Sequence, residues 1–249
     1  MKRVKLVVAY DGTNYCGWQV QKNGETIESV LNRAIGELTG EEIHVMGSSR
    51  TDAGVHACGN VAVFDTEARM AADKFSYALN QRLPEDIRIQ DSCEVPADFH
   101  PRFQKTVKTY EYRILNREFP LPAYRFNSHF TYRKLDVERM KQAAAYLLGE
   151  HDFQSFCAAG AQVKTTVRTI YALDVEKQGD LIIIRITGNG FLYNMVRIIA
   201  GTLMKIGQGD WEPECIPEIL AGCDRQLAGP TAPARGLTLM EIHFKGEKG

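Results

Sequence analysis

The sequence lacks the features that would place the protein in a membrane or outside the cell. Its 249 residues contain no run of about 18 apolar residues, so we expect no membrane-spanning helix. The start, MKRVKLVVAYDG, lacks a small-residue cleavage site after its short apolar run, which predicts a strand instead of a signal peptide. Six scattered cysteines without a C-x-x-C pair indicate reduced thiols, a cytoplasmic protein and no zinc site.

Nucleotide-binding fingerprints are also missing. The sequence contains no P-loop, and its TGNGF stretch is too short to count as a Rossmann glycine pattern. The formal net charge is only −1, so no strong excess of one sign marks the whole chain as a nucleic-acid binder. No Gly/Pro/Ser-rich linker separates independent modules.

The charge is nevertheless distributed unevenly. Residues 99–134 carry eight Lys/Arg and two Glu, while the rest of the chain carries 22 Lys/Arg and 29 Asp/Glu. The same segment holds nine Phe/Tyr. Cations interleaved with aromatic rings suit a phosphate backbone with unstacked bases nearby, although a solvated strand face with core aromatics has the same composition.

Hydrophobic periodicity predicts an α+β fold of two similar halves, each with strands and helices and a mixed, largely antiparallel sheet flanked by helices. We place the halves at residues 1–104 and 105–249. Helices are predicted over 27–38, 137–148 and 193–206, with a short one over 73–83; Thr26 and Asp136 are the expected N-caps. Strands are predicted over 4–10, 41–49, 59–67, 87–95, 108–115, 169–188 and 237–244, the sixth being a hairpin that turns at residues 178–180.

The stretch SSRTDAGVHACGN, residues 48–60, connects two of these strands and is unusually polar. Asp52 there has two readings: an aspartate that caps its own turn, or a catalytic group presented by a rigid scaffold. Arg50 suits either a solvated surface or a phosphate contact. His56 suits a hydrogen bond within the loop or a metal ligand, but Asp52 and His56 alone are too few for a metal site.

A second unusual position is Arg197, which interrupts the apolar helix YNMVRIIAGTLMKI. A guanidinium on a buried helix either extends to the surface or pairs with a carboxylate. Asp52 is an attractive partner, because pairing would hold its carboxylate ionised, as a nucleophile or base requires.

The motifs AYDGTNYCGWQ, RTDAGVHA, FHPRF, KTYEYRI, NGFLYNMVRIIAG and APARGLTL occur in the order seen in TruA-type tRNA pseudouridine synthases, so the whole chain resembles that family. The resemblance implies the pseudouridine synthase fold, with the active-site cleft between the halves. It implies an isomerase that converts uridine to pseudouridine at positions 38, 39 and 40 of the tRNA anticodon arm. It also implies a homodimer without metal or other cofactor.

The resemblance assigns roles to individual positions. Asp52 would be the essential aspartate, Tyr110 would stack on the flipped base, and Arg197 would pair with Asp52. Arg50 would act at the RNA, and Leu237 would line the pocket. The expected RNA contacts are Arg50, His100, Arg102, Lys105 and Lys108. Departures from the usual family pattern at Ser49, Pro101 and Thr238 affect the pocket wall and RNA contacts only.

Three questions remain open at this point. The residues do not decide whether Asp52 attacks the sugar as a nucleophile or acts as a base in glycal formation. A non-catalytic RNA-binding protein would use only the basic aromatic segment, and would leave Asp52 and Arg197 unexplained together. A metal-dependent nuclease built on Asp52 and His56 would cleave tRNA and lose activity in chelator.

Overall fold

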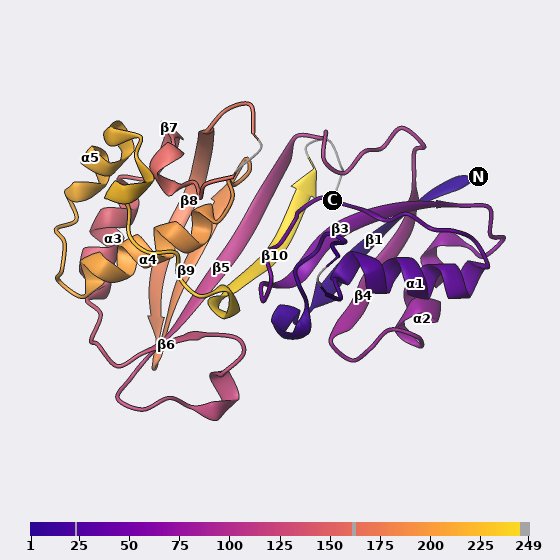
Figure 1. Ribbon diagram of the computed structural model, residues 1–249, viewed down its shortest axis with the longest axis horizontal. Coiled ribbons are helices and arrows are strands. Elements are labelled where there is room, and N and C mark those ends of the chain that lie inside the picture. The colour runs from indigo at the N-terminus through magenta and orange to yellow at the C-terminus, as the bar shows by residue number, and fades with distance from the viewer. Residues whose placement is uncertain (23, 161–162, 245–249) are drawn as a thin grey trace. The chain divides into compact units, whose positions relative to one another are not determined.

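The computed structural model describes residues 1–22, 24–160 and 163–244, which form two compact units (Figure 1). Of the described residues, 1–22, 24–105 and 239–244 form unit 1, and 106–160 and 163–238 form unit 2. The chain first passes from unit 1 to unit 2 after Lys105, one residue later than the predicted boundary. The sequence placed the whole final strand with the C-terminal half, whereas residues 239–244 of that strand group with unit 1.

Unit 1 is an antiparallel sheet with helices. Its elements are β1 (Lys2–Tyr10), α1 (Ile27–Thr39), β2 (Met46–Gly47), β3 (His56–Thr66), α2 (Phe75–Asn80), β4 (Ile87–Val95) and most of β10 (Leu237–Phe244). The strand order is β4-β1-β3-β10, and β2 pairs with β3. Alternate side chains of β1 are fully or almost fully buried, as the period of two requires, and the apolar stripe of α1 covers the core.

Unit 2 contains a second sheet region. Its elements are β5 (Thr106–Asn116), β6 (His129–Thr131), α3 (Val137–Ala145), β7 (Gly149–Asp152), β8 (Val167–Gln178), β9 (Leu181–Gly188), α4 (Met195–Gly207) and α5 (Cys215–Gly222). Strands β5-β9-β8-β7 are antiparallel neighbours, and β6 runs parallel to β5. The parallel β5–β6 pair beside antiparallel neighbours makes the sheet mixed, so the α+β class with a mixed, largely antiparallel sheet is confirmed.

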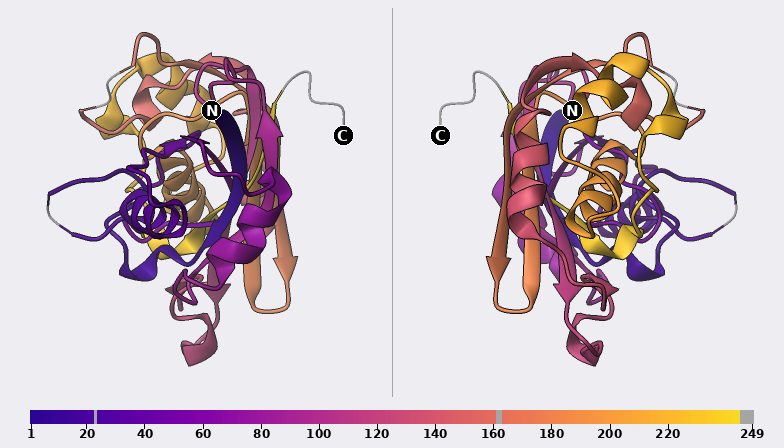
Figure 2. Two further views of the ribbon diagram at one scale, coloured as in Figure 1. Left: turned by 90° about the vertical axis from the view of Figure 1, so that its right-hand side faces the viewer. Right: turned by 90° about the vertical axis from the view of Figure 1, so that its left-hand side faces the viewer.

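The helices of unit 2 protect one face of its strands. Ile182, Ile184 and Ile186 of β9 alternate into the core, while Tyr171 on β8 remains exposed. Helix α3 packs on both β8 and α4, and Figure 2 shows α4 and α5 on one side of the strands. Among the described residues, no helix is both long and apolar enough to cross a membrane.

Local signals account for the elements that were predicted well. Thr26 caps α1 through a capping box with Ser29, and Asp136 accepts hydrogen bonds from two backbone N–H groups at the start of α3. The β8–β9 hairpin turns at Gln178–Leu181 as expected. Helix α3 ends at Ala145, three residues earlier than predicted, and the chain enters β7 through Gly149 at φ +95°.

The predicted strand over 41–49 is wrong for most of its length. Only Met46–Gly47 pairs with β3. The Val45 backbone N–H instead donates to Oδ1 of Asn32 on α1, at 2.8 Å, so a helix side chain replaces a neighbouring strand as its partner. Strands β6 and β7 and helix α5 were not predicted.

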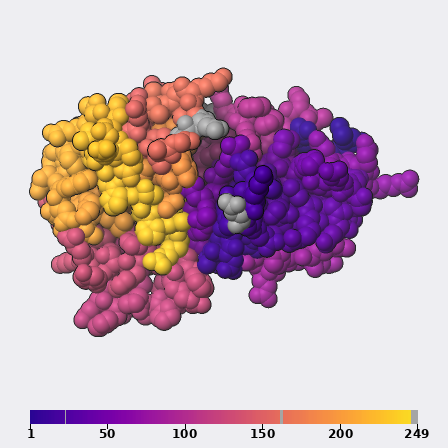
Figure 3. Space-filling model, viewed as in Figure 1, coloured from indigo at the N-terminus to yellow at the C-terminus, as the bar shows by residue number. Residues whose placement is uncertain are grey.

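The segment between β5 and β6, residues 117–128, extends beyond the ends of the strands (Figure 1), and its atoms lie at the surface in the space-filling view (Figure 3). Phe119 is 67% exposed, and the Arg125 guanidinium lies 4.1 Å from the centre of the Phe126 ring. This part of the basic aromatic segment is therefore a surface loop, whereas Tyr112 within the same segment belongs to the core.

Candidate active site

The polar connection of unit 1 is a tight turn with Asp52 at its start. The Val55 backbone N–H donates to the carbonyl of Asp52 at 3.1 Å, and Gly54 adopts φ +77°. Asp52 is half-buried, between buried Thr51 and exposed Ala53. A short, glycine-containing turn between two strands fixes the backbone of the aspartate while leaving its side chain partly accessible.

The first motif of the chain packs directly beneath this turn. A Cβ atom at Gly17 would lie 2.7 Å from the Thr51 carbonyl oxygen, and one at Gly12 would lie 2.0 Å from the carbonyl oxygen of Val55. The Trp18 backbone N–H donates to the Thr51 carbonyl at 3.0 Å. The glycines of AYDGTNYCGWQ therefore permit a close approach of two backbones. No role was predicted from the sequence for these two glycines, although both lie in a motif that the sequence analysis singled out.

His56 lies at the other end of the turn and is buried. The Gly12 backbone N–H donates to Nδ1 of His56 at 3.2 Å. The same nitrogen lies 3.0 Å from Oδ1 of Asp11. These contacts give His56 a part in fastening residues 11–12 to the start of β3. Among the described residues, no group of three His, Cys, Asp or Glu side chains is arranged to hold a metal ion.

Basic and aromatic side chains gather beside the turn within unit 1. Nε of Arg102 donates to the Gly47 carbonyl at 2.9 Å, and Oγ of Ser48 donates to the Pro101 carbonyl at 2.9 Å. Partial burial, and then the nearby charge of Arg50, lower the pKa of Arg102 from its ordinary value. Arg50 is exposed, and the action of its charge on Arg102 shows that the two cations lie near each other.

The neighbouring rings extend this surface. His100 stacks on Phe103 with ring centres 4.0 Å apart and planes 20° apart, and Phe103 is 84% exposed. Lys105 is also exposed. Of the expected RNA contacts, unit 1 thus holds Arg50, His100, Arg102 and Lys105, whereas Lys108 lies on β5 in unit 2.

Tyr110 lies on β5, opposite Ile186 of β9. Its half-buried ring meets Phe191 edge to face, with centres 5.2 Å apart and planes 84° apart. Phe191 comes from the NGFLYNMVRIIAG motif, so this contact fixes the orientation of the Tyr110 ring against the chain that leads into α4. An aromatic ring held in this manner suits the predicted stacking role.

Arg197 occupies the first turn of α4 and is fixed by its own unit. Its Nε donates to the Ala232 carbonyl at 2.7 Å, and its Nη1 donates to Oδ1 of Asn194 at 2.8 Å. The Ala232 backbone N–H donates in turn to the carbonyl of Arg197 at 3.1 Å. The motif APARGLTL is thereby joined to the arginine helix, which explains why the two motifs occur together.

The same motif is joined to β5. The Tyr112 hydroxyl donates to the Pro233 carbonyl at 2.9 Å, and a Cβ at Gly236 would lie 2.6 Å from the Tyr112 ring. Burial raises the pKa of Tyr112 above its usual value, against the opposing charges of Arg197 and Arg235. Tyr112 is therefore a neutral donor, and it positions the backbone just before buried Leu237.

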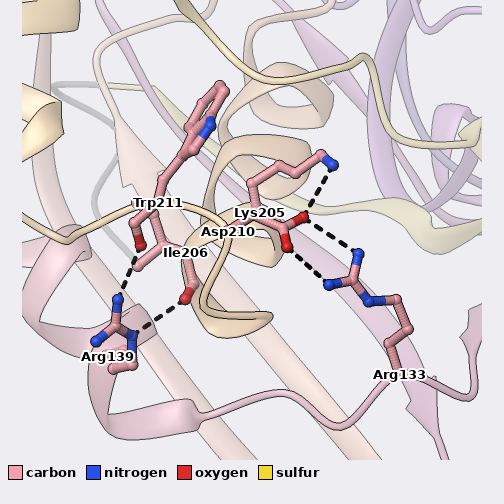
Figure 4. Close-up of polar contacts among 6 residues, drawn as sticks. All are labelled: Arg133, Arg139, Lys205, Ile206, Asp210 and Trp211. Atoms are coloured by element: carbon pink, nitrogen blue, oxygen red, sulfur yellow. Dashed lines mark hydrogen bonds and ion pairs between the residues drawn. The ribbon is translucent and has the colours of Figure 1, made fainter.

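Helix α4 is also held at its far end (Figure 4). Asp210 accepts from Arg133 at 2.7 and 3.1 Å and from Lys205 at 3.0 Å. Arg139 donates to the carbonyls of Ile206 and Trp211. Hydrogen bonds from Arg133 and Lys205 lower the pKa of Asp210 to about 2. The helix that carries Arg197 is thus anchored at both ends within unit 2.

The structure therefore brings the predicted residues together in two groups. Arg50, Asp52 and Arg102 lie around the turn of unit 1. Tyr110, Arg197 and Leu237 belong to the framework of unit 2. The predicted pairing of Asp52 with Arg197 joins one residue from each unit and stays a prediction.

Comparison with known proteins identifies this combination of motifs. The family model described as tRNA pseudouridine synthase matches residues 6–104 and 143–245. The tRNA pseudouridine synthase A of Acetivibrio thermocellus is 49% identical over 244 residues, covering 98% of this chain and 100% of the relative. The enzyme of the same name from Brevibacillus brevis is 51% identical over 245 residues, with the same coverage. The chain therefore belongs to the tRNA pseudouridine synthase family.

Proposed function

We propose that this protein isomerises uridine to pseudouridine in tRNA. The observation that carries the proposal is the Asp52 turn, in a chain that is about half identical to tRNA pseudouridine synthases over almost its full length. Backbone contacts from Gly12, Gly17 and Trp18 hold this turn from below. Such support suits a carboxylate that must meet a reacting atom with fixed geometry.

The reaction breaks the bond between C1′ of the ribose and N1 of uracil, and forms a bond between C1′ and C5. The proton on C5 leaves and N1 gains one, so the product is an isomer and no electrons are exchanged with a co-reactant. Asp52 acts at the sugar, either as a nucleophile on C1′ or as a base that assists glycal formation.

Tyr110 and Arg197 are proposed to complete the site. The target base must leave its stack, and the Tyr110 ring offers it an aromatic surface. Arg197 is proposed to pair with the Asp52 carboxylate and keep it ionised. Leu237 is proposed to line the pocket that receives the flipped nucleotide. The contacts of Arg197 with Ala232 and Asn194 support its side chain in a defined orientation.

The proposed substrate region is the anticodon arm, with positions 38, 39 and 40 as targets. Arg50, Arg102 and Lys105 supply cations for the phosphate backbone, and the exposed His100–Phe103 stack offers a platform for an unpaired base. Arg50 is closest in sequence to Asp52, which suits a contact to the target nucleotide or its phosphate. Lys108 adds a further cation two residues before Tyr110.

We further propose that the enzyme acts as a homodimer in the cytoplasm and needs neither a metal nor another cofactor. Light scattering during size-exclusion chromatography tests the dimer. Activity in the presence of a chelator tests the metal requirement. A monomer that retains full activity would overturn the first proposal, and loss of activity in chelator would overturn the second.

Release of tritium from tRNA carrying [5-³H]uridine tests the function, since the C5 hydrogen leaves only when the new bond forms there. We expect release by the unaltered protein and none by Asp52→Ala or Asp52→Asn, with both variants still folded and still binding tRNA. Full release by either variant would reject the catalytic assignment. Binding of tRNA by the unaltered protein without release would instead favour a non-catalytic RNA-binding protein.

A further inference from the structure

A buried hydrogen-bond network lies beneath the residues that lead into Asp52. Nδ2 of Asn60 donates to the Ser49 carbonyl at 3.0 Å, and the Ser49 backbone N–H donates to Oδ1 of Asn60 at 3.3 Å. One side chain thus holds both backbone groups of a residue three positions before Asp52. Asn60, on β3, has no exposed surface.

The network continues from β3 to β1 and back to the turn. Nδ2 of Asn60 also donates to the Tyr10 hydroxyl at 3.2 Å. That hydroxyl shares a hydrogen bond of 2.7 Å with Oγ1 of Thr51, the residue directly before Asp52. Tyr10 and Thr51 are only 5% and 7% exposed, so the network is almost entirely shielded from bulk water.

We propose that Asn60 and Tyr10 are positioning residues for Asp52, a role that rests on the proposed function of that carboxylate. Ser49 and Thr51 flank Arg50, so the network fixes the backbone on both sides of Arg50 and up to the peptide that joins Thr51 to Asp52. The Trp18 backbone N–H, which donates to the Thr51 carbonyl, holds the same residue from the other direction.

Stability alone gives weak reason for such a network. A typical internal hydrogen bond contributes only about 0.5–1.5 kcal/mol net, and apolar groups of the same shape are nearly as stable in a core. A fully connected polar cluster instead specifies one arrangement of the chain. Catalysis benefits from that precision, since a displacement of about 1 Å at a reacting group can cost on the order of a hundredfold in rate.

The chain contains a matched control for this network. Nδ2 of Asn80 donates to the Ile89 carbonyl at 2.8 Å, and the Ile89 backbone N–H donates to Oδ1 of Asn80 at 2.8 Å. Asn80 therefore holds both backbone groups of one residue, as Asn60 does, and in the same unit. It holds β4 and not the Asp52 turn.

The test is single-turnover tritium release with enzyme in excess over [5-³H]uridine-labelled tRNA, alongside tRNA binding and urea denaturation. We expect Asn60→Ala and Tyr10→Phe to lower the rate constant between about tenfold and a hundredfold, with the Kd for tRNA unchanged. Asn80→Ala should lose stability but keep its rate constant within about threefold of the unaltered protein. If Asn60→Ala does not fold, Tyr10→Phe and Thr51→Val decide the question.

Two outcomes would overturn the positioning role. One is a rate constant for the Asn60 and Tyr10 variants as high as that of Asn80→Ala. The other is loss of rate that appears only through weaker tRNA binding. Asp52→Ala, measured in the same assay, separates this proposal from the proposed function: release that survives in Asp52→Ala rejects the catalytic assignment of that carboxylate, and absence of release by the unaltered protein rejects the function itself. Release lost in Asp52→Ala but kept in the Asn60 and Tyr10 variants rejects only the positioning role.

Discussion

Nδ1 of His56 lies 3.0 Å from Oδ1 of Asp11 and 3.2 Å from the backbone nitrogen of Gly12. A neutral Nδ1 accepts the Gly12 hydrogen bond, and a protonated Nδ1 donates to the Asp11 carboxylate. Burial raises the pKa of Asp11, but hydrogen bonds from Thr13 and the nearby His56 outweigh it, so the pKa is lower than usual. The imidazole thus connects the start of β3 with the end of β1.

We expect His56→Leu to destabilise the protein by about 1–3 kcal/mol, because it leaves the N–H of Gly12 without its acceptor. His56→Asn is the matched variant, since the amide oxygen offers an acceptor close to where Nδ1 lies. Urea denaturation of the three proteins measures the difference. Folded His56→Asn protein should retain tritium release, and loss of release without loss of stability would show that His56 takes part in the chemistry.

Gly17→Ala is expected to lower both stability and activity. Gly17 adopts φ +86°, where an L-residue costs about 1–2 kcal/mol. The new Cβ would also lie 2.7 Å from the Thr51 carbonyl oxygen and 3.1 Å from the carbonyl carbon of Asp52, so the Asp52 turn must shift. Denaturation and tritium release together measure the two effects.

Gly40→Ala separates backbone strain from displacement of the turn. Gly40 has a similar φ of +75°, and, apart from Gly40 and its two chain neighbours, no described residue has an atom within 4 Å of the position of its Cβ. This variant should lose about the same 1–2 kcal/mol from strain alone and keep its rate constant. Equal activity of the two folded variants would contradict the role given to Gly17.

Local chemistry explains which parts of this molecule could be predicted from the sequence. Thr26 and Asp136 cap helices through residues two or three positions away, and the β8–β9 turn is equally local. The Asp52 turn was recognisable for the same reason. Such features depend on a few neighbouring residues, so their pattern carries the information.

The support of the site depends instead on residues distant in sequence. Asn60 and Tyr10 are 50 positions apart and meet only because β1 and β3 pair. Neither residue has a local pattern that marks it as polar and buried. The strand predicted before Met46 does not form for the same reason: Asn32 of α1, which is distant in sequence, accepts the hydrogen bond from the Val45 backbone that a neighbouring strand would have accepted.

The Asp210 cluster predicts a specific pH dependence of stability. The pKa of Asp210 is lowered from 3.8 to about 2, so the folded state favours the ionised carboxylate. Its stabilising contribution is therefore present above the unfolded pKa and is lost as the pH falls through the folded pKa. Asp210→Asn removes these ion pairs and should lower the Tm near neutral pH. The decrease should be only a few degrees, because exposed ion pairs contribute little to stability.

Thermal unfolding over a pH series checks this expectation. The difference in Tm between the unaltered protein and Asp210→Asn should be constant above about pH 5 and disappear towards about pH 2. Glu67→Gln is a suitable control, since Glu67 forms an exposed ion pair with the N-terminal amino group within unit 1. A difference for Asp210→Asn that persists unchanged at the acid end would contradict the ion-pair explanation.

The basic surface beside the Asp52 turn predicts how salt affects tRNA binding. Arg102 is held by the Gly47 carbonyl, and the proximity of Arg50 gives this surface two adjacent cations. Each cation that neutralises a phosphate releases counterions, so affinity falls as salt rises. Arg102→Gln should weaken tRNA binding and reduce the slope of log Kd against log salt concentration by about one. Lys74→Gln is the control, because Asp73 already pairs with Lys74 at 2.9 Å. Equal slopes for Arg102→Gln and the unaltered protein would exclude Arg102 from the phosphate contacts.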